Sequence, residues 1–374
     1  MTDSLPAPAV GSRGLEDGPV QDLPEHETIE NHICRHAVPS AQGGYPGASL
    51  HQAIGDYLYR AHGDWTRALE EFRFALEGLP NDAGLWENIG YAHRRLGNWQ
   101  AVLEAFDKVL NLDPRNVNAM RDLGALSLEQ IRPYPEAVEW CGRALSLAPD
   151  YALADVHRGR IWTSWTGQLD SLGAALDRHP PEADWGGAGG PGPWRALTLL
   201  WGRELDSLLA LASRSPPVFE NQIFFIPSSL YAAWAQHLMG DAPASQEAFR
   251  SAVTFLDSAV AILPDDWRLH ASRGMALAGL GQKDEARAEA RWLESSRIYK
   301  DDAAWGPRLW EDRARVLAAI GDFDAALEEI ERLLAGPSFL SVHTLQLDPR
   351  WDPLRDDPHF QALLVKYANP EGRG

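Results

Sequence analysis

Cysteine is nearly absent from this chain of 374 residues, which contains only Cys34 and Cys141. Two cysteines in unrelated contexts exclude a disulfide framework, and they favour a reducing cytoplasm as the location. The chain also has no run of eighteen apolar residues, so we expect no transmembrane helix. Its first 40 residues show no basic segment followed by an apolar core, so we expect no signal peptide.

Basic residues are in the minority: 34 Lys and Arg stand against 53 Asp and Glu, which gives a formal net charge of −19. So acidic a chain argues against nucleic acid or an anionic membrane as the main partner, because both would repel it. An apolar content of 45% nevertheless excludes wholesale disorder.

Catalytic signatures are missing too. The chain has no G-x-S-x-G, no phosphate-binding P-loop, no H-E-x-x-H and no kinase motif, so we expect neither an enzyme nor a cofactor. The segment GAGGPG at Gly187–Gly192 matches a dinucleotide fingerprint, but neighbouring prolines interrupt the strand and helix that this fingerprint needs. A flexible loop is the better interpretation. His26, His32, Cys34 and His36 match no structural zinc spacing, so we expect no metal site there.

What the chain does contain is a repeat. Trp65–Pro80 reads WTRALEEFRFALEGLP and Trp99–Pro114 reads WQAVLEAFDKVLNLDP, an ungapped match at an offset of 34 residues. A third copy, Tyr134–Pro149, follows at an offset of 35. A period near 34 with aromatic, small and proline positions in phase is typical of stacked helical hairpins.

The pattern resembles the tetratricopeptide repeat (TPR) family. Counted from Ala83, the second unit has Gly90 at position 8, where a small residue lets two helices approach, and Gly97 at position 15, where a glycine ends the first helix. The first unit, counted from Ser49, departs from the pattern with Asp56 at position 8. The resemblance implies an all-α TPR-type α-solenoid, a right-handed superhelix of about eight helical hairpins without a sheet.

Composition and repeat spacing together predict five regions: a disordered N-terminal segment at 1–45, three regular units at 46–150, degenerate hairpins with a Gly/Pro-rich loop near 181–193 at 151–265, two further units at 266–335, and capping helices with a tail at 336–374.

A second resemblance covers roughly residues 48–367. The runs SLYAAWAQHLMGD, ILPDDWRLHASRGMALAGLG and LSVHTLQLDPRWDPLRDDPHFQALL look like the C-terminal TPR sensor region of bacterial multidomain signalling proteins. In those proteins the array follows a kinase, an adenylate cyclase or a winged-helix domain. This chain shows no such effector domain.

Stacked first helices should line the concave face through repeat positions 2, 5, 9, 12 and 13. These positions hold Tyr57, Arg60, Glu87, Tyr91, Arg94, Arg95, Asn118, Arg121, Arg268, Met275, Arg308, Glu311 and Arg315. We predict nine of them as partner-binding residues: Tyr57, Arg60, Glu87, Tyr91, Arg94, Arg121, Arg308, Glu311 and Arg315. Tyrosine and arginine are the residues of interface hot spots. The alternative, that they are ordinary exposed helix residues, stays open at this point.

Some TPR proteins hold a partner's C-terminal carboxylate with Lys and Asn at positions 5 and 9. Here these positions carry Ala53 and Tyr57 in the first unit and Glu87 and Tyr91 in the second, so that clamp is absent. The tryptophans of the degenerate middle either fill the core or line a groove: Trp162, Trp165, Trp185, Trp194 and Trp201.

The sequence therefore predicts a non-enzymatic interaction scaffold or sensor that binds a protein or peptide segment in the concave groove. The alternative is an accessory region of a signalling enzyme, such as a kinase, adenylate cyclase or glycosyltransferase, whose catalytic domain is missing or on a separate chain. Neither the partner's identity nor the oligomeric state follows from the sequence.

Overall fold

A computed structural model describes residues 46–126, 133–180 and 190–368 of the chain. The predicted disorder at 1–45, the His26, His32, Cys34 and His36 cluster, Trp185 and most of the loop predicted near 181–193 lie outside the described residues.

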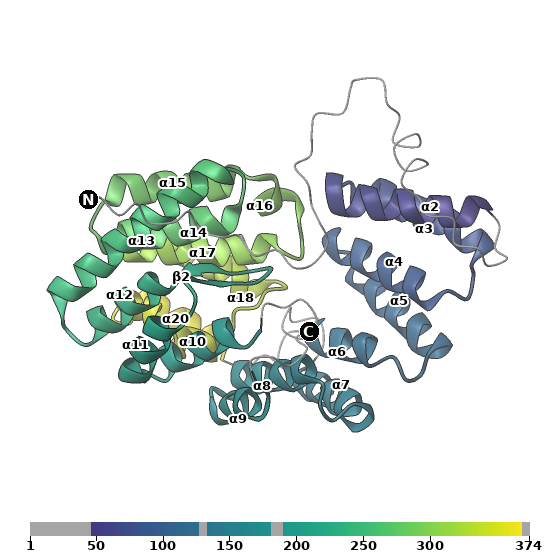
Figure 1. The fold of residues 1–374 in the computed structure, drawn as a ribbon, viewed down its shortest axis with the longest axis horizontal. Coiled ribbons are helices and arrows are strands. Elements are labelled where there is room, and N and C mark those ends of the chain that lie inside the picture. Colours follow the sequence, from purple (N-terminus) through teal and green to yellow (C-terminus); the bar gives the residue numbers. More distant parts are fainter. Residues whose placement is uncertain (1–45, 127–132, 181–189, 369–374) are drawn as a thin grey trace, which may run out of the picture.

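Eight helical hairpins follow one another along a curved path in this part of the chain (Figure 1). They are α2 (Pro46–Tyr57) with α3 (Trp65–Gly78), α4 (Ala83–Arg95) with α5 (Trp99–Leu112), α6 (Val117–Ala125) with α7 (Tyr134–Leu147), α8 (Ala152–Thr166) with α9 (Asp170–Arg178), α10 (Gly192–Trp201) with α11 (Leu205–Arg214), α12 (Ser228–Leu238) with α13 (Ala242–Ile262), α14 (Trp267–Gly279) with α15 (Lys283–Ser295), and α17 (Gly306–Ile320) with α18 (Phe323–Ala335). The expected helical solenoid is confirmed.

Shorter elements complete the array. A π-helical turn, η1 (Leu58–His62), extends α2, and α16 (Arg297–Asp301) lies between the last two hairpins. Three pieces follow α18: α19 (Val342–Leu347), the 3-10 helix η3 (Pro349–Leu354) and α20 (Pro358–Lys366). Within the described ranges, no helix has both the length and the apolar character needed to cross a membrane.

The helix boundaries follow from local chemistry. The second helix of four hairpins begins at an aromatic residue of the repeat: Trp65, Trp99, Tyr134 and Phe323. The first helices α4, α6 and α14 begin with a side-chain cap, as where the Asp82 carboxylate accepts the Leu85 N–H at 2.9 Å. Gly97, with φ of 74°, ends α4 in the left-handed region that other residues avoid.

Glycine also allows the two helices of a hairpin to touch. A Cβ at Gly90 would lie 3.1 Å from Phe106 Cε2, and one at Gly124 would lie 2.5 Å from Cys141 Sγ. At Gly159 the obstacle is backbone, since a Cβ would lie 2.7 Å from Leu172 Cα. The absence of a side chain at these positions therefore sets the distance between paired helices.

The first hairpin departs from the predicted register. Gly55, not Asp56, makes the close approach: a Cβ there would lie 2.5 Å from Phe72 Cε1. Asp56 instead accepts a hydrogen bond from Asn88 Nδ2 at 3.0 Å. Because a π turn holds one residue more than an α turn, η1 takes up the extra residue before Gly63 ends the helix. Placing Asp56 at position 8 was wrong by one residue.

The expectation of no sheet was wrong at one place. β1 (Val218–Glu220) and β2 (Phe225–Pro227) form an antiparallel two-stranded ribbon in which Phe219 faces Ile226. Prolines at both ends of this segment prevent a helix, and its aromatic and β-branched residues favour strands. Asn221 fixes the turn, because its Oδ1 accepts the N–H groups of Ile223 at 2.9 Å and Phe224 at 2.8 Å.

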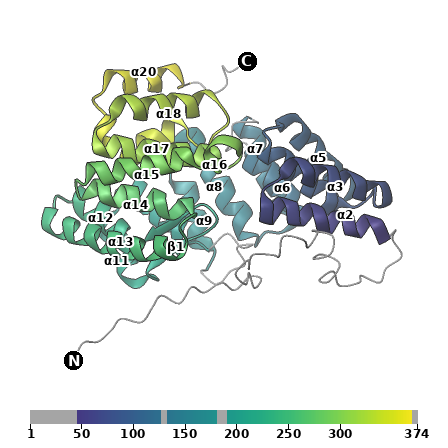
Figure 2. The same ribbon diagram turned by 90° about the horizontal axis from the view of Figure 1, so that it is seen from above.

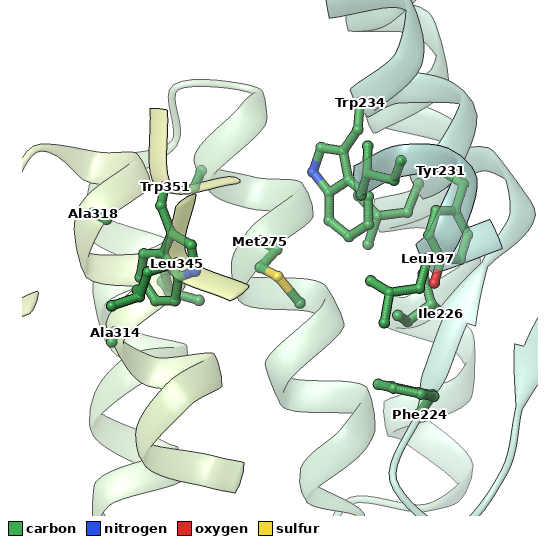
Figure 3. Packing of buried hydrophobic residues seen from close by; sticks show 14 of the residues in the cluster. Leu197, Phe224, Ile226, Tyr231, Trp234, Met275, Ala314, Ala318, Leu345 and Trp351 are labelled. Carbon is green, nitrogen blue, oxygen red and sulfur yellow. The ribbon is translucent and has the colours of Figure 1, made fainter. Parts of the chain in front are cut away.

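The largest core joins α8–α15 and α17–α20. Figure 3 shows side chains of this core from several elements, among them Trp234 of α12, Met275 of α14 and Trp351 of η3. Trp351 is 0% exposed, so the segment after α18 is an integral part of the fold. No single hairpin could bury this much apolar surface alone.

The glycine contact gives a direct test. In Gly159→Ala the new methyl group meets the backbone of Leu172, so we expect a loss of about 1–3 kcal/mol in the free energy of unfolding. The matched control is Gly142→Ala on α7, where a Cβ meets nothing within 4 Å. That variant should gain about 0.5–1 kcal/mol from helix propensity alone. Urea denaturation of both variants checks the difference, and equal effects would contradict the contact.

Candidate functional site: a cavity on the inner face

The two ends of the curved array meet. The Ala303 N–H donates to the Arg95 carbonyl at 3.0 Å, and the Arg297 guanidinium donates to the carbonyls of His62 at 3.1 Å and Gly63 at 2.8 Å. Seen from above, α16 lies on the side of the C-terminal helices that faces the N-terminal hairpins (Figure 2). The segment 297–305, which follows α15, therefore bridges the concave side.

A second contact closes the array further along. Phe339, after α18, packs against the cluster that contains Tyr134 and Ile161, and its ring stacks on Trp305 with centroids 6.5 Å apart. α19 also contacts α8. The concave side is thus not an open groove in the described part of the chain, but a space bounded on two sides.

A cavity of about 540 Å³ occupies this space. Its wall comes from η1, from the first helices α4, α6, α8 and α10, from the β1–β2 turn and from Trp305 and Phe339. The lining residues are Tyr59, Tyr91, Arg94, Arg95, Arg121, Asp122, Ala125, Leu153, His157, Arg160, Trp194, Asn221, Gln222, Ile223, Trp305 and Phe339. This volume is typical of ligand pockets.

The glycine contacts explain which residues reach the cavity. Tyr91 follows Gly90, Ala125 follows Gly124 and Arg160 follows Gly159, and each of the three lines the wall. Since the glycine faces its own hairpin partner, the next residue is turned by about 100° and faces inward. The same glycine therefore sets both the packing and the inner surface.

Comparison with known protein families matches residues 83–116 to the family described as Tetratricopeptide repeat. Residues 83–116, α4 with α5, are a tetratricopeptide repeat. The sequence prediction is confirmed for this unit, which supplies Tyr91, Arg94 and Arg95 to the cavity. The described part of the chain is thus built of helical repeats, a kind of fold typical of protein–protein interaction.

Two relatives are each described as a peroxisomal targeting signal receptor. The protein from Kluyveromyces lactis is 33% identical over 90 residues, which are 24% of this chain and 16% of that protein. The protein from Candida glabrata is 29% identical over 126 residues, which are 33% of this chain and 21% of that protein. The matches thus span about a fifth or less of the length of either relative.

Two solved structures are similar in fold. A tetratricopeptide repeat protein from Parabacteroides merdae is 16% identical, with a TM-score of 0.34, and the match covers 87% of this chain and 100% of that one. PilW, described as a type IV pilus biogenesis factor, is 15% identical, with a TM-score of 0.36, and the match covers 69% and 97%.

Tyr91 of α4 and Arg121 of α6 meet at one carboxylate of the cavity wall, that of Asp122. The Tyr91 hydroxyl donates to Asp122 Oδ2 at 2.7 Å, and Arg121 Nη1 lies 2.9 Å from Asp122 Oδ1. Burial and the neighbouring Asp122 charge raise the pKa of Tyr91, so the phenol stays a neutral donor. Asp122 thereby orients two groups that a ligand can contact.

Arg94 and Arg95 lie beside the bridging segment. Arg95 pairs with Asp302 and lies over the Trp65 ring, with Cζ 4.8 Å from the centroid. Arg94 lies over the Trp305 ring at 5.6 Å. Burial lowers the pKa of Arg95 and raises that of Asp302, so removal from water outweighs the attraction between the two charges. The ion pair nevertheless gives each of the two buried groups a neighbouring charge of opposite sign.

Arg160 and His157 form the part of the wall contributed by α8. The Arg160 guanidinium stacks on the Trp194 ring, with Cζ 3.8 Å from its centroid. His157 Nδ1 is buried and has no hydrogen-bond partner within the described residues. Burial, together with the positive charges of Arg160, Arg121 and Arg94, lowers the pKa of His157 well below its usual value. This side of the cavity is rich in positive charge.

The structure sorts the predicted partner-binding residues into four groups. Tyr91, Arg94 and Arg121 line the cavity. Glu87 lies beside it and accepts a hydrogen bond from Asn116 Nδ2 at 2.8 Å. Tyr57 and Arg60 do not line it, and Tyr59 takes their place. The π turn η1 explains this shift, because it rotates the helix face by part of a turn.

Arg308, Glu311 and Arg315 belong to the interior instead, with exposed fractions of 8%, 5% and 3%. Arg308 pairs with Glu311 at 3.2 Å, Arg315 also pairs with Glu311, and Arg315 lies 3.3 Å from Asp348. The segment after α18 supplies Asp348 and covers this group. These three residues, although at groove-facing positions, are used for internal ion pairs.

Sequence reasoning missed His157 and Arg160. Their hairpin lacks most repeat anchors, so its register was not assigned. The signal was present at Gly159, because aligning this glycine with Gly90 puts Arg160 beside Tyr91 in the repeat. Trp194 was one of the middle tryptophans for which core and groove both stayed open, and it is both: 5% exposed and part of the cavity wall. Among the described residues, no group of three or more His, Cys, Asp or Glu is placed to hold a metal ion.

The low pKa of His157 predicts a pH dependence. The folded state keeps this imidazole neutral, whereas the unfolded chain binds a proton near pH 6.5. Stability should therefore fall as the pH drops below that value, by about 1.4 kcal/mol per pH unit for one group. In His157→Gln this contribution is absent. The free energy of unfolding of both proteins, measured at pH 7.0 and 5.5, tests this contribution. If the variant and the unchanged chain show the same pH dependence, His157 is not its cause.

Proposed function

We propose that this protein is a non-enzymatic interaction scaffold that holds an acidic segment of a protein partner in the inner cavity. The carrying observation is the charge of the wall. Arg94, Arg95, Arg121 and Arg160 line the cavity with a single carboxylate, Asp122. In a chain of net charge −19 such a surface is the exception, and it favours an anionic ligand.

The size and chemistry of the cavity support a short segment rather than a folded domain. About 540 Å³ accommodates a few side chains, and the bridging segment 297–305 bounds the opening. Tyr59, Tyr91, Trp194 and Trp305 offer aromatic area beside the arginines, the combination that dominates binding energy at interfaces. The TPR fold and the names of the two relatives, receptors for a targeting signal, agree with a role in binding a protein segment.

The site in this proposal is narrower than the one predicted from the sequence. It keeps Tyr91, Arg94 and Arg121, adds Tyr59, His157, Arg160 and Trp194, and leaves out the buried Arg308, Glu311 and Arg315. The resemblance to bacterial signalling sensors, a role as accessory region of a signalling enzyme and a cytoplasmic location stay predictions.

The test uses a partner captured with the full chain and identified by mass spectrometry. Tyr91→Phe combined with Arg94→Ala removes a hydroxyl donor and a charge from the wall but keeps the ring that packs on Phe106. We expect binding to weaken by about 2 kcal/mol, or roughly 30-fold, measured by calorimetry.

A second double variant is the control, because it also removes one arginine and also changes one aromatic residue. Arg73→Ala with Phe74→Ala alters neighbouring exposed residues of α3, outside the cavity. This variant should bind as the unchanged chain does. If the cavity variant stays folded and keeps full affinity, or if both variants lose it equally, the partner binds elsewhere.

A further inference from the structure

Resting on the proposed function, we infer that Arg160 is an anion-binding residue of the cavity, and that it pairs with a carboxylate of the bound segment. The inference starts from a charge that has no counterpart. Among the described residues, Arg160 makes no ion pair and no hydrogen bond, and its one specific contact is the stack on Trp194 at 3.8 Å.

The neighbouring charges are already matched. Arg160 lines a second, smaller pocket together with members of a group of three arginines and three carboxylates: Arg308, Arg315, Arg350, Glu311, Asp312 and Asp348. Each carboxylate of this group lies within 3.3 Å of an arginine of the group, for example Asp348 with Arg350 at 2.7 Å. The charges of this group balance one another, and Glu311, whose negative charge partly offsets that of Arg160, is already paired with Arg308 and Arg315.

The surroundings of Arg160 make the lack of a paired carboxylate energetically unfavourable. Burial, and next the nearby charge of Arg308, lower the pKa of Arg160 to about 9. An arginine is almost always fully charged, so the direction of this shift means that the charge is poorly compensated. An incoming anion would supply the compensation that the fold omits.

The stacking geometry leaves the donors of Arg160 free. A guanidinium is planar, and its N–H groups lie in that plane, so a ring on its face blocks none of them. Trp194 is itself held in place, because the Phe224 ring meets it edge-on with centroids 5.1 Å apart. The guanidinium is thus positioned before any ligand arrives, which lowers the entropy lost on binding.

Other groups of the wall fit the same ligand chemistry. His157 Nδ1 and Trp194 Nε1 are buried without a hydrogen-bond partner among the described residues. Asn221 and Gln222, from the β1–β2 turn, add side-chain amides on the opposite element. Arg94 and Arg121 bring further positive charge from α4 and α6. Unsatisfied polar groups beside an uncompensated charge are the features of a binding site, since the fold alone does not use them.

A purely structural role makes a different prediction about stability. If Arg160 served only to pack on Trp194, then Arg160→Met would lose the cation–π contact and unfold at a lower temperature. If Arg160 is a binding residue kept at a cost to the fold, removing its charge leaves the melting temperature unchanged or raises it by about 2–4 °C.

The binding experiment uses the full chain and defined probes. The probes are an acetylated, amidated hexaglutamate peptide, the matching hexalysine peptide and citrate as a free polyanion. Binding is followed by calorimetry and by the fluorescence of the tryptophans at the cavity. We expect hexaglutamate to bind and Arg160→Gln to weaken it about tenfold or more, as befits a charge-assisted hydrogen bond. Hexalysine should not bind.

Arg143→Gln is the matched control. Arg143 also stacks on a tryptophan, Trp140, at 4.1 Å, but it is exposed and lies outside the cavity. The two variants have the same net charge, so a general electrostatic effect would weaken both equally. Binding by Arg143→Gln should equal that of the unchanged chain.

The outcomes separate the two proposals. If hexaglutamate binds equally well with and without Arg160, the inference is overturned and the acidic-segment scaffold stands. If citrate binds through Arg160 but the peptide does not, the anion site stands and the protein segment is wrong as its source. If neither probe binds, or if Arg160→Met melts at a lower temperature and binds normally, Arg160 is a packing residue.

Discussion

The contact between a glycine on the first helix of a hairpin and the second helix of the same hairpin determines how several units are built, those that form the cavity wall among them. At Gly90, Gly124 and Gly159 a side chain would collide with the partner helix. Because that face of the helix is committed to its partner, the next residue points to the inside of the array. Packing and the choice of inner residues are therefore one constraint, repeated from unit to unit.

The charged side chains of the repeat array have two different kinds of surroundings. In the interior, arginines and carboxylates of α17 and of the segment around Asp348 neutralise one another, as buried charges must. At the cavity the arginines outnumber the carboxylates, and aromatic rings take part of the space that counter-charges would fill. The same residue type is fully matched by carboxylates in one place and in excess over them in the other.

The sequence predicted what depends on local spacing. The period of 34 residues, the aromatic start at Trp99 and the glycine end at Gly97 are all read within one unit, and they gave the correct fold. It did not predict features that depend on residues far apart. The π turn η1, the pairing of β1 with β2 and the bridge from Ala303 to Arg95 each need a contact that no periodicity records.

The candidate site shows the same division. Tyr91, Arg94 and Arg121 were found because their units follow the repeat closely. Arg308 and Arg315 also sit at the predicted positions, but the C-terminal segment folds over them, and a repeat pattern cannot contain that information. Arg160 was missed for the opposite reason. It occupies the same place in its hairpin as Tyr91 does in its own, but the sequence of its hairpin does not follow the repeat pattern.

A positive cavity inside an acidic molecule has a kinetic consequence. Beyond the Debye length of about 8 Å at physiological ionic strength all of these charges are screened, and the weak field that remains at an approaching acidic segment is mainly the repulsion of the net negative charge of the chain. Attraction takes over only once the segment is at the cavity mouth. Added salt would then speed the encounter while weakening the final contacts, so association and dissociation rates both rise. The arrangement selects against loosely matching polyanions, which are repelled before they are bound.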